Sequence, residues 1–246
     1  MKKVLKILKS LKSGISRINI KIKAGEETEI NCQGPHIDEE ELLNLFDKID
    51  NIQSGDTLII AGNIPNTLPD DVYERIIERL DGKDVRIVVD ATKKLLVNSL
   101  KYKPFLIKPN RQELSEIFDT TVKTESDVVK YAQELQKMGA KNVLIKGGHF
   151  DGEPIDILLD EKNEVYRFMG KRINTKNTHG TGCTLSSAIT ANIAKGMNVA
   201  DAVRCAKDYV TNAIKYSFSI GKGHGPTNHF YDYYNILENN EKADEI

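Results

Sequence analysis

Gly180-Thr181-Gly182-Cys183 combines a glycine turn with a thiol, and the small-residue segment 184–195 that follows is typical of a helix. A glycine turn that opens a helix presents backbone N–H groups that have no partner inside the helix. These donors and the positive end of the helix dipole form a site for an anion such as phosphate. A thiol placed there can act as a base, so the tetrapeptide predicts phosphoryl transfer. The alternative is a plain glycine turn with a buried cysteine beside the helix.

Asn110 and Glu113 lie three residues apart at the start of a second expected helix. An amide and a carboxylate in this arrangement can hold a hydrated Mg²⁺ beside a triphosphate, because magnesium prefers oxygen ligands and keeps several waters. The alternative is a helix cap in which Glu113 completes a capping box. The pair taken alone favours the cap.

Composition and charge exclude several classes of partner. The chain has 246 residues, of which 39% are hydrophobic and 29% charged, and its net charge is -1. This balance is typical of a globular protein and gives no general attraction to nucleic acid or to an anionic membrane. The three cysteines show no metal-ligand spacing and favour a reducing compartment, so we expect a cytoplasmic protein. No apolar run is long enough to span a bilayer.

The sequence predicts one domain over residues 17–235, with a short segment on either side of it. Residues 1–16 are basic, with apolar residues at helical spacing, and predict an amphipathic helix packed on the domain. A role at a membrane surface or in targeting is the alternative for this helix. Residues 236–246 form a polar tail.

Strands alternate with helices along the domain. Strands are predicted over 17–23, 28–31, 57–61, 85–89, 105–107, 142–145, 155–159 and 164–168, and helices over 38–49, 69–80, 110–118, 125–138, 184–195 and 199–216. This order predicts an α/β fold with a mostly parallel sheet that carries helices on both faces. Ligands of such sheets bind at the carboxyl ends of the strands. Asp90, Asn110, Gly147 and the turn at Gly180 are therefore expected to converge on one rim.

Together, the Asn110/Glu113 pair and the 180–183 turn resemble the ribokinase-like superfamily of small-molecule kinases. Two branches of that superfamily are visible. Residues 17–144 resemble 1-phosphofructokinases and tagatose-6-phosphate kinases, in the segments 17–23 (RINIKIK), 30–35 (INCQGP), 54–56 (SGD), 61–65 (AGNIP), 68–71 (LPDD) and 103–110 (KPFLIKPN). Residues 145–235 resemble hydroxymethylpyrimidine phosphate kinases, in the segments 146–149 (KGGH), 177–183 (NTHGTGC), 221–226 (GKGHGP) and 228–230 (NHF). Cysteine in place of the aspartate of the sugar kinases marks the pyrimidine branch.

The resemblance implies a ribokinase-like three-layer fold that binds ATP and Mg²⁺. Relative to both branches, we expect the fold to be truncated at its N-terminus, where the family carries a substrate segment. Near Lys146 the resemblance changes from the sugar-kinase branch to the pyrimidine-kinase branch, as expected of a natural or an engineered chimera. Exposed sheet positions left by the loss would favour a homodimer.

Site residues follow from the resemblance. The N–H groups of Gly180, Thr181, Gly182 and Cys183 would stabilise charge on the transferred phosphate, and Cys183 would take the proton of the acceptor hydroxyl. Asn110 and Glu113 would position Mg²⁺. Nucleotide-binding candidates are Lys146, Gly147, Lys176, Thr178, Gly223 and His224, and sugar-phosphate candidates are Arg17, Asn19 and Lys21. Structural roles are the alternative for each: a surface or loop lysine, a capping threonine, a glycine-rich connector, an exposed edge strand. Cys32 and Cys205 are expected to be a partly buried and a core residue without function.

Three functions remain open on the sequence. The first is phosphorylation of hydroxymethylpyrimidine or its phosphate in thiamine synthesis, and the second is phosphorylation of fructose 1-phosphate or tagatose 6-phosphate. The third is a catalytically silent remnant that binds a nucleotide or has a structural role.

Overall fold

The structure is a computed structural model that describes residues 17–22, 28–150, 153–170, 172–175, 177–178, 180–218 and 225–233. The predicted helix within residues 1–16, the polar tail 236–246, Lys176, Gly223 and His224 lie outside these ranges. No helix in the described part of the chain is long and apolar enough to cross a membrane.

The main sheet has six strands in the order β3-β4-β5-β6-β7-β8. Strands β3 to β6 are parallel, whereas β6, β7 and β8 are antiparallel neighbours. The six strands are β3 Thr57–Ala61, β4 Arg86–Asp90, β5 Leu106–Ile107, β6 Asn142–Phe150, β7 Glu153–Leu159 and β8 Val165–Met169. This confirms the predicted mostly parallel sheet.

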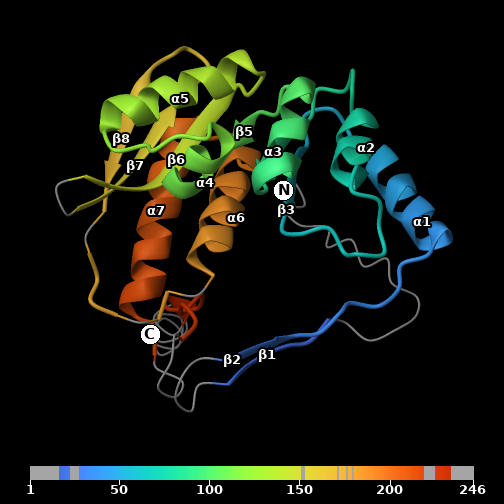
Figure 1. The fold of residues 1–246 in the computed structure, drawn as a ribbon, viewed down its shortest axis with the longest axis horizontal. Coiled ribbons are helices and arrows are strands. Elements are labelled where there is room, and N and C mark those ends of the chain that lie inside the picture. Colours follow the sequence, from blue (N-terminus) through green and yellow to red (C-terminus); the bar gives the residue numbers. More distant parts are fainter. Residues whose placement is uncertain are drawn as a thin grey trace, which may run out of the picture.

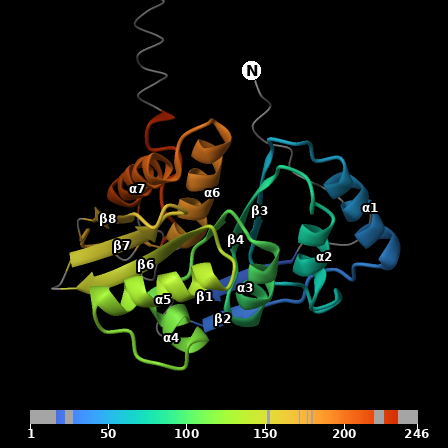
Figure 2. The ribbon, with the colours of Figure 1, turned by 90° about the horizontal axis from the view of Figure 1, so that it is seen from above.

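Helices cover both faces of the sheet and give three layers, which Figure 2 shows with α6 and α7 on one side and α3, α4 and α5 on the other. The helices are α1 Glu39–Asp50, α2 Val72–Glu78, α3 Lys93–Ser99, α4 Arg111–Ile117, α5 Glu125–Lys137, α6 Thr181–Ala194 and α7 Val199–Lys215, and the short 3-10 helix η1 covers Leu100–Tyr102. Each face has its own apolar core. Alternate residues of β4 divide between them, since Ile87 and Val89 pack with α1 to α5 and Val88 packs with α6 and α7.

Caps fix several helix starts where the sequence predicts them. Asp38 begins the predicted helix 38–49, and its side chain accepts a hydrogen bond from the N–H of Glu41 at 2.8 Å, so Asp38 is the N-cap of α1. Helix α2 is shorter than the predicted 69–80, since Pro69 to Asp71 form a turn before it and Leu80 closes its end by bonding to the carbonyl of Ile77. Helix α3 was not predicted, because its two turns are too short to show a clear period.

Strands β1 (Asn19–Ile22) and β2 (Thr28–Asn31) form a separate antiparallel ribbon. Figure 1 shows this ribbon apart from the six-stranded sheet. Apolar alternation over 17–23 predicts a half-buried strand, and the turn that follows it predicts pairing with 28–31. The pairing is confirmed, whereas the prediction of a half-buried face is wrong. Ile20 remains 46% exposed and Ile22 45% exposed, because neither the main sheet nor a described helix covers that face.

Two predictions about cysteines are also wrong. Cys205 is exposed rather than buried in the core. Helix α7 buries a stripe of Ala202, Ala206, Val210 and Ala213, and Cys205 lies beside that stripe. Cys32 is exposed because it follows β2 in the uncovered ribbon.

Candidate active site

A cavity of about 290 Å³ opens at the carboxyl ends of β4 and β5, beside β6 and the start of α6. It is lined by Asp90, Lys108, Asn110, Glu113, Lys146, Gly147, Gly182 and Cys183. The predicted convergence of Asp90, Asn110, Gly147 and the glycine turn on one rim is therefore confirmed. The cause is topological, since parallel strands end at the same edge and each is followed by a connection that carries polar residues.

The glycine turn begins α6 at this edge. Gly180 is the N-cap residue with φ +86°, a left-handed conformation that a side chain disfavours. The carbonyl of Gly180 accepts the N–H of Thr184 at 2.9 Å and the hydroxyl of Thr184 at 2.8 Å, which locks the first turn. Gly182 and Cys183 then face the cavity, and the thiol of Cys183 is exposed. The alternative of a buried cysteine beside a plain turn is thereby excluded.

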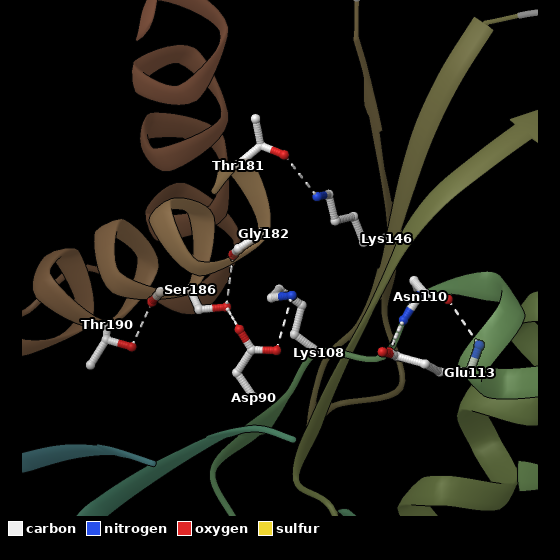
Figure 3. A network of polar contacts seen from close by, with 9 residues as sticks. All are labelled: Asp90, Lys108, Asn110, Glu113, Lys146, Thr181, Gly182, Ser186 and Thr190. Atoms are coloured by element: carbon white, nitrogen blue, oxygen red, sulfur yellow. Dashed lines mark hydrogen bonds and ion pairs between the residues drawn. The ribbon is translucent and has the colours of Figure 1, made fainter. Parts of the chain in front are cut away.

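Lys146 extends from β6 toward this turn. Its Nζ lies 3.5 Å from Oγ1 of Thr181, as Figure 3 shows. Burial lowers the pKa of Lys146 from its usual value, and the neighbouring Lys108 ammonium lowers it further. The charges of Asp156, Asp90 and the Cys183 thiolate act in the opposite direction. Within the described ranges no carboxylate lies within ion-pair distance of Lys146, so its charge is available to an anion.

Gly147 is held in a bulge of β6 beside Lys146. The bulge interrupts the pairing of β6 with β7 between Ile145 and Gly148, and Gly147 has φ +74°. The N–H of Gly147 donates to Oδ1 of Asp156 at 2.8 Å. Lys207 on α7 holds the other oxygen of Asp156 at 2.7 Å. The predicted strand 142–145 therefore continues past the bulge to Phe150, and the bulge turns Gly147 to the cavity.

Asn110 and Glu113 form a complete capping box at the start of α4. Oδ1 of Asn110 accepts the N–H of Glu113 at 2.8 Å, and Oε2 of Glu113 accepts the N–H of Asn110 at 2.8 Å. The capping interpretation is thus correct. It is compatible with a metal role as well, because a carboxylate has about four lone-pair sites and the cap uses one. Among the described residues, no group of three or more His, Cys, Asp or Glu side chains could hold a metal ion directly. One amide oxygen and one carboxylate fit a largely hydrated Mg²⁺ held through waters, because Mg²⁺ prefers oxygen ligands and keeps several waters.

Asp90 and Lys108, which line the cavity, belong to a polar group that no sequence motif predicted. Lys108 Nζ lies 3.2 Å from Oδ1 of Asp90, and Ser186 on α6 donates to Oδ2 of Asp90 at 2.6 Å. The pairing joins residues far apart in the sequence (Figure 3). The sequence signal that could have found them is the position of Asp90 and Lys108 directly at the ends of predicted strands, where ligands of such sheets bind.

The structure does not bring every predicted residue to the cavity. Thr178 is exposed and accepts the N–H of Thr181 through its carbonyl at 3.4 Å. Arg17 and Asn19 belong to the segment of the exposed ribbon, where Arg17 donates to the carbonyl of Cys32 at 2.9 Å. Lys21 has its backbone in β1. A sugar-phosphate role for these three residues stays a prediction.

Comparisons with known proteins place this arrangement in a family. The sequence model of the phosphomethylpyrimidine kinase family matches residues 80–228, which include all eight residues that line the cavity. The chain belongs to this family. Both branches predicted from the motifs are confirmed as resemblances, within the ribokinase-like superfamily.

Individual relatives cover different parts of the chain. A 1-phosphofructokinase from Bacillus subtilis is 34% identical over 206 residues, which are 84% of this chain and 65% of that protein. A hydroxymethylpyrimidine/phosphomethylpyrimidine kinase from Haemophilus influenzae is 40% identical over 129 residues, which are 51% of this chain and 48% of that protein. The chain thus spans less than two thirds of the length of these curated relatives.

Solved structures support the fold. The pyridoxal kinase of Bacillus subtilis, solved as an ADP complex, superposes with a TM-score of 0.68 at 26% identity. The superposition covers 88% of this chain and 85% of that structure. The three-layer ribokinase-like architecture is therefore shared with known small-molecule kinases.

Proposed function

We propose that this chain is an ATP- and Mg²⁺-dependent kinase that transfers the γ-phosphate to a hydroxyl of hydroxymethylpyrimidine or of its phosphate. The observation that carries the proposal is the shared cavity, in which the thiol of Cys183, the first turn of α6 and the ammonium of Lys146 face one another. A base, a row of N–H donors and a cation are the groups that phosphoryl transfer needs. Family membership and the ADP complex of the related pyridoxal kinase support a nucleotide as the phosphate donor.

In the proposed reaction, Cys183 as thiolate takes the proton of the acceptor hydroxyl. The oxygen of that hydroxyl then forms a bond to the γ-phosphorus while the bond to the bridging oxygen of ADP breaks. The N–H groups of Gly182 and Cys183 stabilise the charge on the transferred phosphate. Lys146 binds a phosphate oxygen of the nucleotide. Asn110 and Glu113 would hold a hydrated Mg²⁺, which would supply positive charge to neutralise the phosphates.

A sugar phosphate is the second candidate acceptor. The 34% identity to a 1-phosphofructokinase extends over 84% of the chain, whereas the pyrimidine kinase matches about half of it. Fructose 1-phosphate and tagatose 6-phosphate therefore belong in the same assay. A silent nucleotide-binding protein is the third possibility, and it would bind ADP without transfer.

The first experiment is release of ADP from Mg-ATP in the presence of hydroxymethylpyrimidine, its phosphate, fructose 1-phosphate or tagatose 6-phosphate. We expect stimulation by a pyrimidine. Stimulation by a sugar phosphate alone would replace the proposed acceptor, and ADP binding without stimulation by any of the four would favour the silent protein.

Cys183→Ala tests the base in the same assay. We expect turnover to fall by a factor of about 10² to 10⁴, the usual contribution of a general base, while the affinity for ADP stays nearly unchanged. Cys205→Ala is the matched control, because Cys205 is an exposed thiol outside the cavity. A rate for Cys183→Ala equal to that of the control would refute the assignment of Cys183.

A further inference from the structure

A chain of polar contacts connects α6 to the ends of two strands. The hydroxyl of Ser186 donates to Oδ2 of Asp90 at 2.6 Å, and the other oxygen of Asp90 lies 3.2 Å from Nζ of Lys108 (Figure 3). These side chains are shielded from water, since Ser186 is 1% exposed and the side chain of Lys108 7% exposed. Asp90 therefore ties the helix that carries Cys183 to the neighbouring strands β4 and β5.

The contact between Ser186 and Asp90 lies one helical turn after the predicted catalytic turn at residues 180–183. Ser186 follows Cys183 by three residues, one turn along α6. Its Oγ also lies 3.3 Å from the carbonyl oxygen of Gly182. A serine hydroxyl has one proton, and the shorter contact to Asp90 takes it. Ser186 therefore links α6, one turn after Cys183, to a charged side chain of the sheet.

Packing alone does not explain a buried hydroxyl at this position. Leu185, Ile189 and Ile193 already hold α6 in the apolar core, with exposures of 3%, 0% and 0%. Apolar contact is non-directional and tolerates small slides or rotations of a helix. A hydrogen bond to a charged acceptor has a defined geometry and resists both.

The next buried hydroxyl of α6 shows the contrast. Thr190 is 7% exposed, and its Oγ1 donates to the carbonyl of Ser186 at 2.7 Å, within the same helix. It therefore makes no link to the sheet. Ser186 makes such a link at the end of the helix that faces the cavity.

We infer that Ser186 and Asp90 are positioning residues that set the place of the α6 turn, and with it the Cys183 thiol, against the cavity; this role rests on the proposed function. A displacement of about 1 Å can cost a factor of about 10² in rate without loss of binding. The link therefore acts on turnover more than on nucleotide affinity.

Kinetics of Ser186→Ala test the inference, with Thr190→Val as the matched control that removes a buried hydroxyl from the same helix. We expect Ser186→Ala to lower kcat by a factor of about 10 to 100, with little change in KM for ATP. We expect Ser186→Thr, which keeps the hydroxyl, to recover most of the rate, and Thr190→Val to stay within about twofold of the wild type. Equal kcat for Ser186→Ala and Thr190→Val would overturn the inference.

A double-mutant cycle tests whether Asp90 is the partner through which Ser186 acts. Asp90→Ala removes the acceptor and is expected to lower kcat in the same direction, and Ser186→Ala added to Asp90→Ala is expected to cause little further loss, because both variants break the same hydrogen bond. Losses that multiply in the double variant would contradict a shared role.

Amide hydrogen exchange gives a readout that needs no turnover. We expect the backbone amides of residues 184–187 to exchange about tenfold faster in Ser186→Ala than in Thr190→Val. Unchanged exchange would overturn the inference. A wild-type chain that transfers no phosphate would refute the proposed function, and the exchange measurement would still decide whether the link holds the turn.

Discussion

Lys146 enters the cavity with its ammonium largely removed from water. Burial and the charge of Lys108 lower the pKa of Lys146 from its usual value. A lysine with a lowered pKa loses its proton at a lower pH than an ordinary lysine, and the neutral amine no longer attracts phosphate. Because the charged form is present below this pKa, we expect affinity for Mg-ADP to be fully present at a pH below it. Affinity should fall as the pH rises through the lowered pKa, before the usual lysine range is reached.

Calorimetric titration of Mg-ADP at several pH values checks this prediction. Lys146→Met should bind weakly at every pH and lose this part of the pH dependence. Lys195→Met is the matched control, since Lys195 is exposed at the far end of α6, and it should keep the wild-type profile. A wild-type affinity that stays constant until the pH reaches the usual lysine range would show that Lys146 does not supply the charge.

Residues with a local signature were predicted better than residues defined by tertiary pairing. The glycine turn and the Asn110/Glu113 pair can each be recognised within four consecutive residues. The structure places Cys183, Asn110 and Glu113 at one cavity. For Asp90, the alternation of strands and helices predicted only a place on the rim of the sheet. Its partner Ser186 lies 96 positions away along the chain, so no local pattern could predict the contact.

Capping boxes begin two helices, and only one of them faces the cavity. Asn110 and Glu113 cap α4 beside the cavity, whereas Thr124 and Asp127 cap α5 in the same reciprocal way away from it. Loss of a cap side chain costs about 1 kcal/mol of stability. Asn110→Ala and Thr124→Ala should therefore lower the free energy of unfolding by similar amounts, measured by urea denaturation. Only Asn110→Ala should also weaken the Mg²⁺ dependence of ADP binding.

Titration of Mg²⁺ at fixed ADP separates the two roles of Asn110. A cap that serves α4 alone predicts the same Mg²⁺ dependence for Asn110→Ala, Thr124→Ala and the wild type. That result would remove Asn110 from the proposed metal site and leave it a structural residue.

Secondary structure was predictable where apolar periodicity and caps agree. Helices α5 and α7 were placed within about one residue at each end, because Thr124 and Asn198 cap them and buried stripes run along their length. Helix α3 was missed, since a helix of two turns offers too few positions to define a period. The continuation of β6 past Gly147 was also missed. A bulge reverses the alternation of side chains, and the residue that holds it, Asp156, comes from the next strand.

At the scale of the whole molecule, the cavity lies where the two helical layers meet the edge of the sheet. Helix α6 belongs to the core on one face and α4 to the core on the other. Each layer therefore contributes one part of the candidate site: the anion turn from α6 and the Asn110/Glu113 pair from α4. The alternation of strands and helices predicted this architecture. The same alternation could not predict that the β1–β2 ribbon lies outside this architecture. A strand covered by its own chain and a strand covered by another chain show the same apolar alternation as residues 17–23.

The uncovered face of the ribbon supports the predicted homodimer, which stays a proposal. Ile20 and Ile22 share one face of β1, Ile18 directly precedes the strand, and Ile30 lies opposite Ile20 on β2. All four are between 45% and 54% exposed. Adjacent exposed apolar side chains favour association, and a second copy offers the same face in a symmetric contact. We expect the wild-type chain to sediment as a dimer and the double variant Ile20→Ser, Ile30→Ser as a monomer.

The opposite face of the ribbon provides a control of matched geometry. Asn19 and Asn31 are also directly opposite each other in the β1–β2 register, so Asn19→Ser with Asn31→Ser changes one cross-strand pair on the polar face. Sedimentation velocity over a range of concentrations should leave this variant dimeric. Because Ile20 and Ile30 are exposed, their replacement should change the free energy of unfolding of the monomer by no more than about 0.5 kcal/mol. A wild-type monomer at every concentration, or a dimer unaffected by the isoleucine changes, would show that this face does not pair with a second copy.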